Sequence, residues 1–132
     1  PKFIDAYFHG QTPTINGDGT TTRDFTHVNN VVSATLQALD NKNQEKDNEI
    51  YNVAFGQQTS LVELTTLIRN ELQSRFVDRA FDAPIYGPSR QGDIQHSYAS
   101  IEKIKKAFGY EPKVDLKEGI RLTVDWFLSS KT

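Results

Sequence analysis

The stretch "GQTPTINGDGTTTRDFTHVNNVV", residues 10–32, carries most of the information about the architecture of this chain. Its segment 12–15 reads as a short extended piece that runs into a Gly-Asp-Gly turn. Phe25 and His27 then alternate with polar neighbours, and together with Arg23 they predict a second short strand. Two short strands around a glycine turn, followed directly by a helical pattern, indicate a fold that combines helices with a few short strands.

Helical periodicity marks two segments in the first third of the chain. Apolar residues recur at helical spacing over residues 1–10, and Gly10 is placed to end that helix. A second helix is predicted over about 29–40, from an apolar stripe made of Val28, Val31, Val32, Thr35, Leu36 and Leu39. The polar run that follows, residues 40–49, is expected to be a solvated loop.

Strand and capping signals continue through the middle of the chain. Residues 50–55, Ile-Tyr-Asn-Val-Ala-Phe, predict a short strand. Ser60 and Glu63 form the pattern of a capping box, in which each side chain satisfies a free backbone amide, and they predict the start of a third helix. Residues 76–98 are interrupted by prolines and glycines, and an irregular segment of this length is typical of a binding loop.

Two further helices are predicted near the end of the chain. Ser100 is placed to cap a short helix that Gly109 ends. Asp115 and Glu118 repeat the capping-box pattern and predict the start of the last helix. The fold class expected from these signals is therefore four or five amphipathic helices with a few short strands.

Composition excludes several classes of function. The net charge of −2 gives no global basic footprint for nucleic acid, and no apolar run is long enough to cross a membrane. The absence of cysteine excludes disulfides and thiolate metal sites and is compatible with a cytoplasmic location. The chain also contains no methionine and begins with Pro1, so we expect it to be a piece of a longer protein.

The Gly-Asp-Gly turn matches no glycine-loop motif. A dinucleotide fingerprint requires glycine where Thr22 stands, and the lysine of a phosphate-binding Walker loop is missing. A calcium loop requires glycine at Thr21 and glutamate at His27. An aspartyl-phosphatase loop would place its nucleophile on Asn16, whose amide cannot attack. The histidines lack paired ligand spacing and no Tyr-x-x-x-Lys pair is present, so neither a metal site nor that proton-transfer pair is predicted.

The residue types that remain point to the binding of an anion. Arg23 and Arg90 both lie in loops or at loop edges, and a guanidinium matches phosphate oxygens with two parallel hydrogen bonds. Asp93 follows the flexible Gly92 and could accept hydrogen bonds from sugar hydroxyls. The alternative is that Arg23 pairs with Asp24 or another neighbour and that Arg90 is simply exposed.

Three segments together resemble a known family. Residues 10–31, with the pattern G-x-x-P-x-I-x-G-D-G-x-x-x-R-D-F-x-x-V-x-x-V, resemble the start of the substrate-binding lobe of extended short-chain dehydrogenase/reductases. "YNVAFGQQTSLVEL", residues 51–64, resembles that family's strand and capped helix. Residues 89–120 resemble its R-x-G-D to L-x-x-G tail. The resemblance covers nearly the whole chain in order. It implies an α/β fold, an α+β-like substrate lobe detached from an N-terminal Rossmann domain.

The resemblance also implies roles for individual residues. The arginines that match Arg23 and Arg90 grip the diphosphate of a nucleotide-sugar, and the aspartate that matches Asp93 holds the ribose. The backbone of three consecutive residues would lie along the uracil ring: Thr14, Ile15 and Asn16. Asn16 stands where many relatives carry an aromatic residue. The combination of Asn16, the "GDG" after it and the later "GDIQHS", residues 92–97, is most similar to the branch of UDP-N-acetylglucosamine 4-epimerases.

The implied parent is a cytoplasmic, NAD-dependent epimerase that oxidises C4 of a UDP-sugar and returns hydride to the other face. NAD and the proton-transfer residues belong to the N-terminal lobe, so residues 1–132 are expected to be one substrate lobe. That lobe would have no catalytic residue and no cofactor or metal site, and would be inactive alone. Its expected partners are the UDP-sugar and the N-terminal Rossmann lobe. We also expect self-association through apolar surface left uncovered, or a loosened loop over 76–95.

Two alternatives stay open at this stage. A nucleotide-sugar dehydratase or decarboxylase of the same family would use a similar lobe. A stand-alone interaction domain, in which the arginines are structural, would be a different class of protein.

Overall fold

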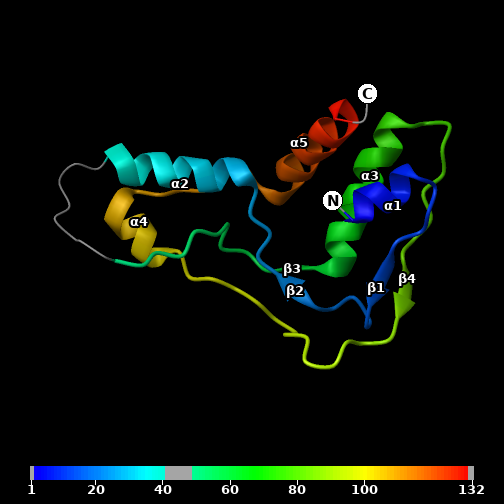
Figure 1. Ribbon diagram of the computed structural model, residues 1–132, viewed down its shortest axis with the longest axis horizontal. Helices are drawn as coiled ribbons and strands as arrows, with labels where there is room; N and C mark the ends of the chain where they lie inside the picture. The colour runs from blue at the N-terminus through cyan, green and yellow to red at the C-terminus, as the bar shows by residue number, and fades with distance from the viewer. Residues whose placement is uncertain (1, 41–48, 131–132) are drawn as a thin grey trace.

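A computed structural model describes residues 2–40 and 49–130. The predicted loop over 40–49 falls almost entirely on residues 41–48, which lie outside that part. The helices and strands are α1 (Lys2–Phe8), β1 (Thr14–Asn16), β2 (Thr22–Arg23), α2 (Val28–Asp40), β3 (Thr59–Ser60), α3 (Leu61–Arg75), β4 (Ile85–Gly87), α4 (Glu102–Phe108) and α5 (Leu116–Ser129). Within the described residues the predicted mixture of helices and short strands is confirmed (Figure 1).

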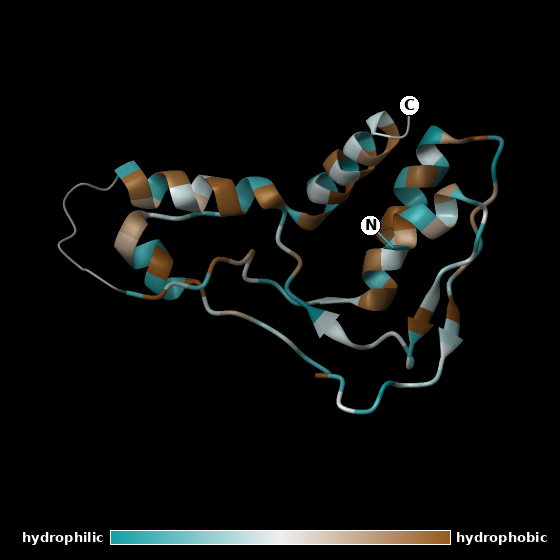
Figure 2. Ribbon diagram, viewed as in Figure 1, coloured by the Kyte–Doolittle hydropathy of each residue, from teal (hydrophilic) through white to brown (hydrophobic). Residues whose placement is uncertain are grey.

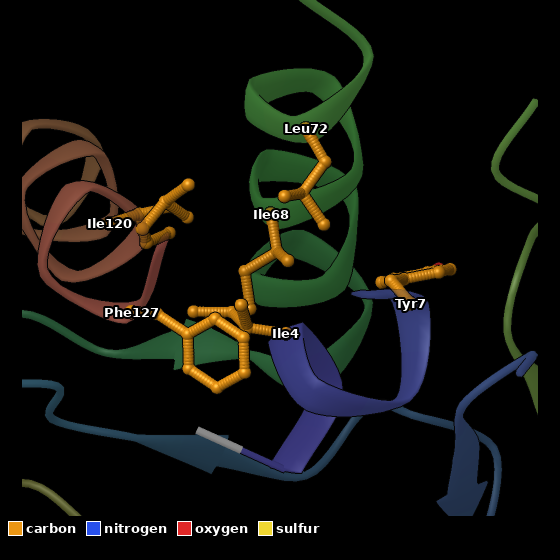
Figure 3. Packing of buried hydrophobic residues seen from close by; sticks show 7 residues of the cluster. Ile4, Tyr7, Ile68, Leu72, Ile120 and Phe127 are labelled. Atoms are coloured by element: carbon orange, nitrogen blue, oxygen red, sulfur yellow. The ribbon is translucent and has the colours of Figure 1, made fainter. Parts of the chain in front are cut away.

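The larger hydrophobic core lies between α1, α3 and α5. Its buried side chains come from all three helices: Ile4, Tyr7, Ile68, Leu72, Ile120, Val124 and Phe127. Figure 3 shows labelled members of this cluster from α1, α3 and α5 pointing toward one another. Leu72 and Val124 are fully buried, and burying side chains of this size contributes about 1.5–3 kcal/mol each. This core holds α1, α3 and α5 together.

A second, smaller core joins α2 and α4 through the segment around Ala54. Its buried members are Ala34, Ala54, Ile101, Ile104 and Tyr110. The hydroxyl of Tyr110 donates to the carbonyl of Ala54 at 3.0 Å, and burial raises the pKa of Tyr110. The side chain of buried Asn30 connects α2 to the segment before α5 through hydrogen bonds to the backbone of Lys113 and Val114.

The capping box predicted for α3 is confirmed, whereas the one predicted for α5 forms only in part. Ser60 and Glu63 form the predicted capping box at the start of α3, and the hydrogen bonds from Ser60 lower the pKa of Glu63. At α5 only half of the predicted box forms, because Asp115 accepts from the amide of Glu118 at 2.8 Å. The Glu118 carboxylate instead binds Arg121 at 2.7 Å, and a guanidinium is a stronger partner for it than a backbone amide.

The predicted cap at Ser100 is wrong. Helix α4 begins one residue later, so Ile101 occupies the N-cap position and offers no side-chain hydrogen bond. The predicted stop at Gly109 is confirmed. Gly109 has φ +68°, a left-handed conformation that glycine adopts without strain.

Two strand predictions are also corrected. Residues 50–55 form no strand, and the predicted strand over 23–27 shrinks to Thr22–Arg23. The cause is a set of side-chain hydrogen bonds that replace a ladder. The Asp24 carboxylate accepts from the amides of Phe55 at 3.1 Å and Gly56 at 3.0 Å, and the Thr26 hydroxyl also accepts from Phe55.

The strands form two small sheets. β1 pairs with β4 in parallel, with Asn16 opposite Gly87, and β2 pairs with β3 in antiparallel. β4 lies inside the segment 76–98, which was predicted to be irregular, and its residues Ile85 and Tyr86 are a short β-prone run between Pro84 and Gly87.

Helix α2 turns its apolar stripe outward. The helix itself is predicted correctly, but its buried residues are Asn30 and Ala34. Val28 and Leu39 at its two ends are 62% and 72% exposed, and the valines and leucine between them are exposed as well. Figure 2 shows hydrophobic residues recurring along this helix among polar ones. The stripe has the composition of an interface without a partner for it among the described residues.

Candidate functional site

The candidate site lies where the two parallel strands β1 and β4 end. Their last residues, Asn16 and Gly87, are opposite each other, and the amide of Gly17 donates to the carbonyl of Gly87 at 3.0 Å. Because the strands are parallel, the loops that follow them leave the sheet at the same edge, where α/β proteins commonly bind ligands. Figure 1 shows β1 and β4 side by side at one end of the molecule.

A polar groove of about 550 Å³ separates these two loops. It is lined by Asn16, Gly17, Asp18, Thr21, Gly87, Pro88, Ser89, Arg90, Asp93 and Gln95. Three residues predicted from the sequence to bind substrate, namely Asn16, Arg90 and Asp93, therefore share one groove. The groove combines a guanidinium, carboxylates, amides and hydroxyls, which is the chemistry that phosphate and sugar hydroxyls require.

The Gly-Asp-Gly turn forms one wall of the groove. The Asp18 carboxylate accepts from the hydroxyl of Thr20 at 2.6 Å and from its amide at 2.9 Å, and these bonds lower the pKa of Asp18. Gly19 has φ +80°, and a Cβ there would lie 2.5 Å from Cγ2 of Val62. The turn leads into β2 rather than into a helix, so it lacks the helix N-terminus that binds pyrophosphate in dinucleotide sites.

The other wall is tied to the strand that carries Arg23. Thr22 donates its amide to the carbonyl of Gln95 at 2.9 Å and accepts from the amide of Ser97 at 3.2 Å. Its hydroxyl also lies 3.0 Å from Nδ1 of His96. β2 is therefore held between β3 on one side and residues 95–97 on the other.

Arg23 lies beside the groove rather than in its lining. Its Nη1 donates to the carbonyl of Thr22 at 2.7 Å. Asp24 is engaged by the amides of Phe55 and Gly56. Within residues 2–40 and 49–130, neither Arg23 nor Arg90 forms an ion pair with a carboxylate, which favours a ligand role over a purely structural one.

The three residues of β1 differ in how they meet the groove. Thr14 is exposed at the start of the strand, and Ile15 is 1% exposed, so its side chain belongs to the interior. Asn16 is half-buried and lines the groove. Any contact of Ile15 with a ligand would therefore run through its backbone.

Sequence reasoning missed most of the groove lining. Gly17 and Asp18 belong to the Gly-Asp-Gly turn, which matched no known motif. Gly87, Ser89 and Gln95 carried no signal of their own, because they reach this turn only through the pairing of β1 with β4. The available signal was the Ile-Tyr pair at 85–86, which has strand character.

A separate cavity of about 620 Å³ opens among α1, α3 and α5. Its lining is mainly apolar and includes Ile4, Phe25, Leu64 and Ile120. No arginine lines it among the described residues, so it does not match the chemistry of a diphosphate. The polar groove is therefore the candidate site.

With this geometry in place, comparison with known proteins defines the class. The sequence profile described as GDP-mannose 4,6 dehydratase matches residues 1–123. The chain therefore belongs to this family of short-chain dehydrogenase/reductases, which includes nucleotide-sugar epimerases and dehydratases. A provisionally named UDP-glucose 4-epimerase of Methanocaldococcus jannaschii is 40% identical over 124 residues, 94% of this chain and 37% of that relative.

Solved structures agree with this assignment. UDP-glucose 4-epimerase of Thermotoga maritima with UDP-glucose has a TM-score of 0.83 and 34% identity, covering 99% of this chain and 39% of that one. UDP-N-acetylglucosamine 4-epimerase of Methanobrevibacter ruminantium, in complex with UDP-N-acetylmuramic acid, has a TM-score of 0.80 and 34% identity, with coverage of 98% and 39%. UDP-glucuronic acid 4-epimerase of Bacillus cereus, in complex with UDP-glucuronic acid and NAD, has a TM-score of 0.79 and 26% identity, with coverage of 97% and 38%.

These coverages mean that the chain spans less than half the length of the proteins it matches. The matched region confirms the expected fold of several helices with a few short strands. In the part of the chain that the structure describes, no helix combines the length and apolar character needed to span a membrane.

Proposed function

We propose that this chain is the UDP-sugar-binding lobe of a nucleotide-sugar 4-epimerase. The observation that carries the proposal is the groove at the ends of β1 and β4, where Arg90, Asp93 and Asn16 converge beside the strand of Arg23. Arg23 and Arg90 would hold the diphosphate through charge-assisted hydrogen bonds. Asp93 would accept from the ribose hydroxyls, and the backbone of residues 14–16 would lie along the uracil.

The substrate we propose is of the UDP-N-acetylglucosamine or UDP-N-acetylgalactosamine type. Two observations support this finer assignment: Asn16 before the Gly-Asp-Gly turn, and the similarity to a solved UDP-N-acetylglucosamine 4-epimerase. A dehydratase or decarboxylase of the same family is the alternative, and the name of the matching family favours it over unrelated functions. Activity measured on the parent enzyme with UDP-N-acetylglucosamine separates these outcomes.

The residues of this chain do not fit NAD. Thr22 replaces the third glycine of the dinucleotide fingerprint, the turn leads into a strand, and no Tyr-x-x-x-Lys pair is present. We therefore propose that residues 1–132 form a single C-terminal lobe, that NAD and the proton-transfer groups lie on an N-terminal Rossmann lobe, and that this chain alone is inactive. NAD supplies the hydride chemistry at C4, and this lobe binds and orients the sugar nucleotide.

Titration calorimetry with UDP and UDP-N-acetylglucosamine tests the proposal. Arg23→Ala and Arg90→Ala should each weaken binding about 10-fold or more, since a hydrogen bond to a charged group contributes about 1.5–3 kcal/mol. Lys117→Ala is the matched control, because Lys117 is an exposed cation on α5 outside the groove. If wild type binds neither ligand, alone or with the Rossmann lobe added, the proposal is wrong. Equal losses in all three variants would point to bulk charge instead.

A further inference from the structure

The side chain of Asn16 faces the guanidinium of Arg90 across the mouth of the groove. Arginine carries five N–H donors and no acceptor, so the amide atom that faces it must be the oxygen. In that amide orientation the oxygen of Asn16 accepts from Nε of Arg90 at 3.0 Å and from Nη2 at 3.3 Å. One residue at the end of β1 thus contacts the arginine of the loop that follows β4.

We propose that Asn16 is a positioning residue for Arg90, and this inference rests on the proposed function of the groove. The amide occupies the edge of the guanidinium formed by Nε and Nη2. Three of the five N–H groups then remain, and two of them, one on Nη1 and one on Nη2, point in parallel from the outer edge. That edge is the one left to hold two phosphate oxygens with parallel hydrogen bonds.

A neutral partner suits this task better than a carboxylate. The amide fixes the direction of the guanidinium but leaves its positive charge uncompensated for an anionic ligand. Arg90 is otherwise exposed, on a loop, and without a carboxylate partner among the described residues. A long exposed side chain loses rotamer freedom when it binds, and a contact that orders it beforehand lowers that cost.

The location of Asn16 makes it suited to this role. It is the last residue of β1, it pairs with Gly87 of β4, and the next amide, that of Gly17, is bonded to the carbonyl of Gly87. Its backbone is therefore held by the sheet, whereas Arg90 lies three residues beyond the end of β4. The residue held by the sheet therefore positions the residue on the loop.

Two measurements on the 132-residue chain test the proposal. The first is ligand-free: the Nε–Hε signal of Arg90 by NMR, with its exchange against water. Asn16→Ala should speed that exchange and shift the signal, and Asn16→Asp should retain the protection because a carboxylate also accepts from Nε. Asn29→Ala, at an exposed position of α2, is the control and should leave the signal unchanged. An unchanged Arg90 signal in Asn16→Ala overturns the proposal.

The second measurement is a double-mutant cycle read by titration with UDP. Asn16→Ala should weaken binding about 3- to 10-fold in wild type and have no further effect in Arg90→Ala. Asn16→Asp should also weaken binding, because it places a negative charge beside the diphosphate. An equal loss in both backgrounds would mean that Asn16 contacts the ligand directly, and it would overturn the positioning role. If wild type does not bind UDP, alone or with the Rossmann lobe added, the proposed function fails, and the NMR measurement still decides the contact between Asn16 and Arg90.

Discussion

Replacement of Asn30 by alanine is expected to destabilise the fold strongly. Asn30 is 2% exposed and makes hydrogen bonds to the backbone at three points. Its Nδ2 donates to the carbonyl of Val114 at 2.8 Å, and its Oδ1 accepts from the amides of Lys113 and Val114 at 3.0 Å each. Alanine removes all three bonds and leaves the backbone groups of the segment before α5 without these partners.

The expected magnitude follows from these bonds. A neutral hydrogen bond contributes about 1 kcal/mol net, so three of them give a loss of about 3 kcal/mol in the free energy of unfolding. With a urea m-value of about 1–3 kcal/mol/M, the midpoint of unfolding should fall by about 1–3 M. A loss of this size is a large part of the stability of a domain, which is typically about 5–15 kcal/mol.

Urea denaturation followed by circular dichroism measures this loss. Asn29→Ala is the control, because Asn29 is exposed at the neighbouring position of α2, and its effect should stay within about 0.5 kcal/mol. If Asn30→Ala unfolds at the same urea concentration as Asn29→Ala, the hydrogen bonds of Asn30 between α2 and the segment before α5 do not contribute about 3 kcal/mol to the free energy of unfolding.

Three further predictions concern surface, pH and the turn. Leu36→Lys, on the exposed stripe of α2, should reduce self-association in analytical ultracentrifugation, and a wild type that is monomeric at all concentrations would contradict this. A hydrogen bond from the Arg75 guanidinium holds the pKa of Asp125 below its ordinary value of 3.8. The stability that Asp125 contributes is therefore present above pH 3.8 and is lost as pH falls through the lowered pKa. Asp125→Asn should therefore flatten the acid limb of stability against pH; an unchanged slope refutes it. Gly19→Ala should cost about 1–3 kcal/mol from left-handed strain plus the clash with Val62, and more than Gly92→Ala, where a Cβ meets nothing within 4 Å; equal thermal shifts would argue against the clash.

The features predicted well from the sequence are those set by nearby residues. The capping box of Ser60 and Glu63 spans one turn of helix, and the left-handed stop at Gly109 depends on a single residue, so local chemistry decides both. The period of the apolar stripe likewise predicts helix α2. Periodicity does not say what covers a face, and here the stripe is exposed while Asn30 and Ala34 are buried.

The features that were missed depend on residues far apart in the sequence. β4 forms because Ile85 and Tyr86 pair with β1. The residues near β4 in the sequence give no indication of this parallel partner, which lies far away in the chain. Ile50, predicted to begin a strand, is 84% exposed, since strand character alone does not supply a ladder partner. For the site, residue type and family resemblance selected Arg90, whereas its contact with Asn16 requires both loops to leave the same sheet edge.

The most direct test of the account compares UDP with uridine on wild type and on Arg90→Ala. The central claim is that the groove holds a diphosphate through arginine, so UDP should bind wild type about 10-fold or more tightly than uridine. In Arg90→Ala that preference should fall about 10-fold or more, while uridine binding stays nearly unchanged. A preference for UDP that is equally large in Arg90→Ala, or its absence in wild type, would contradict the claim.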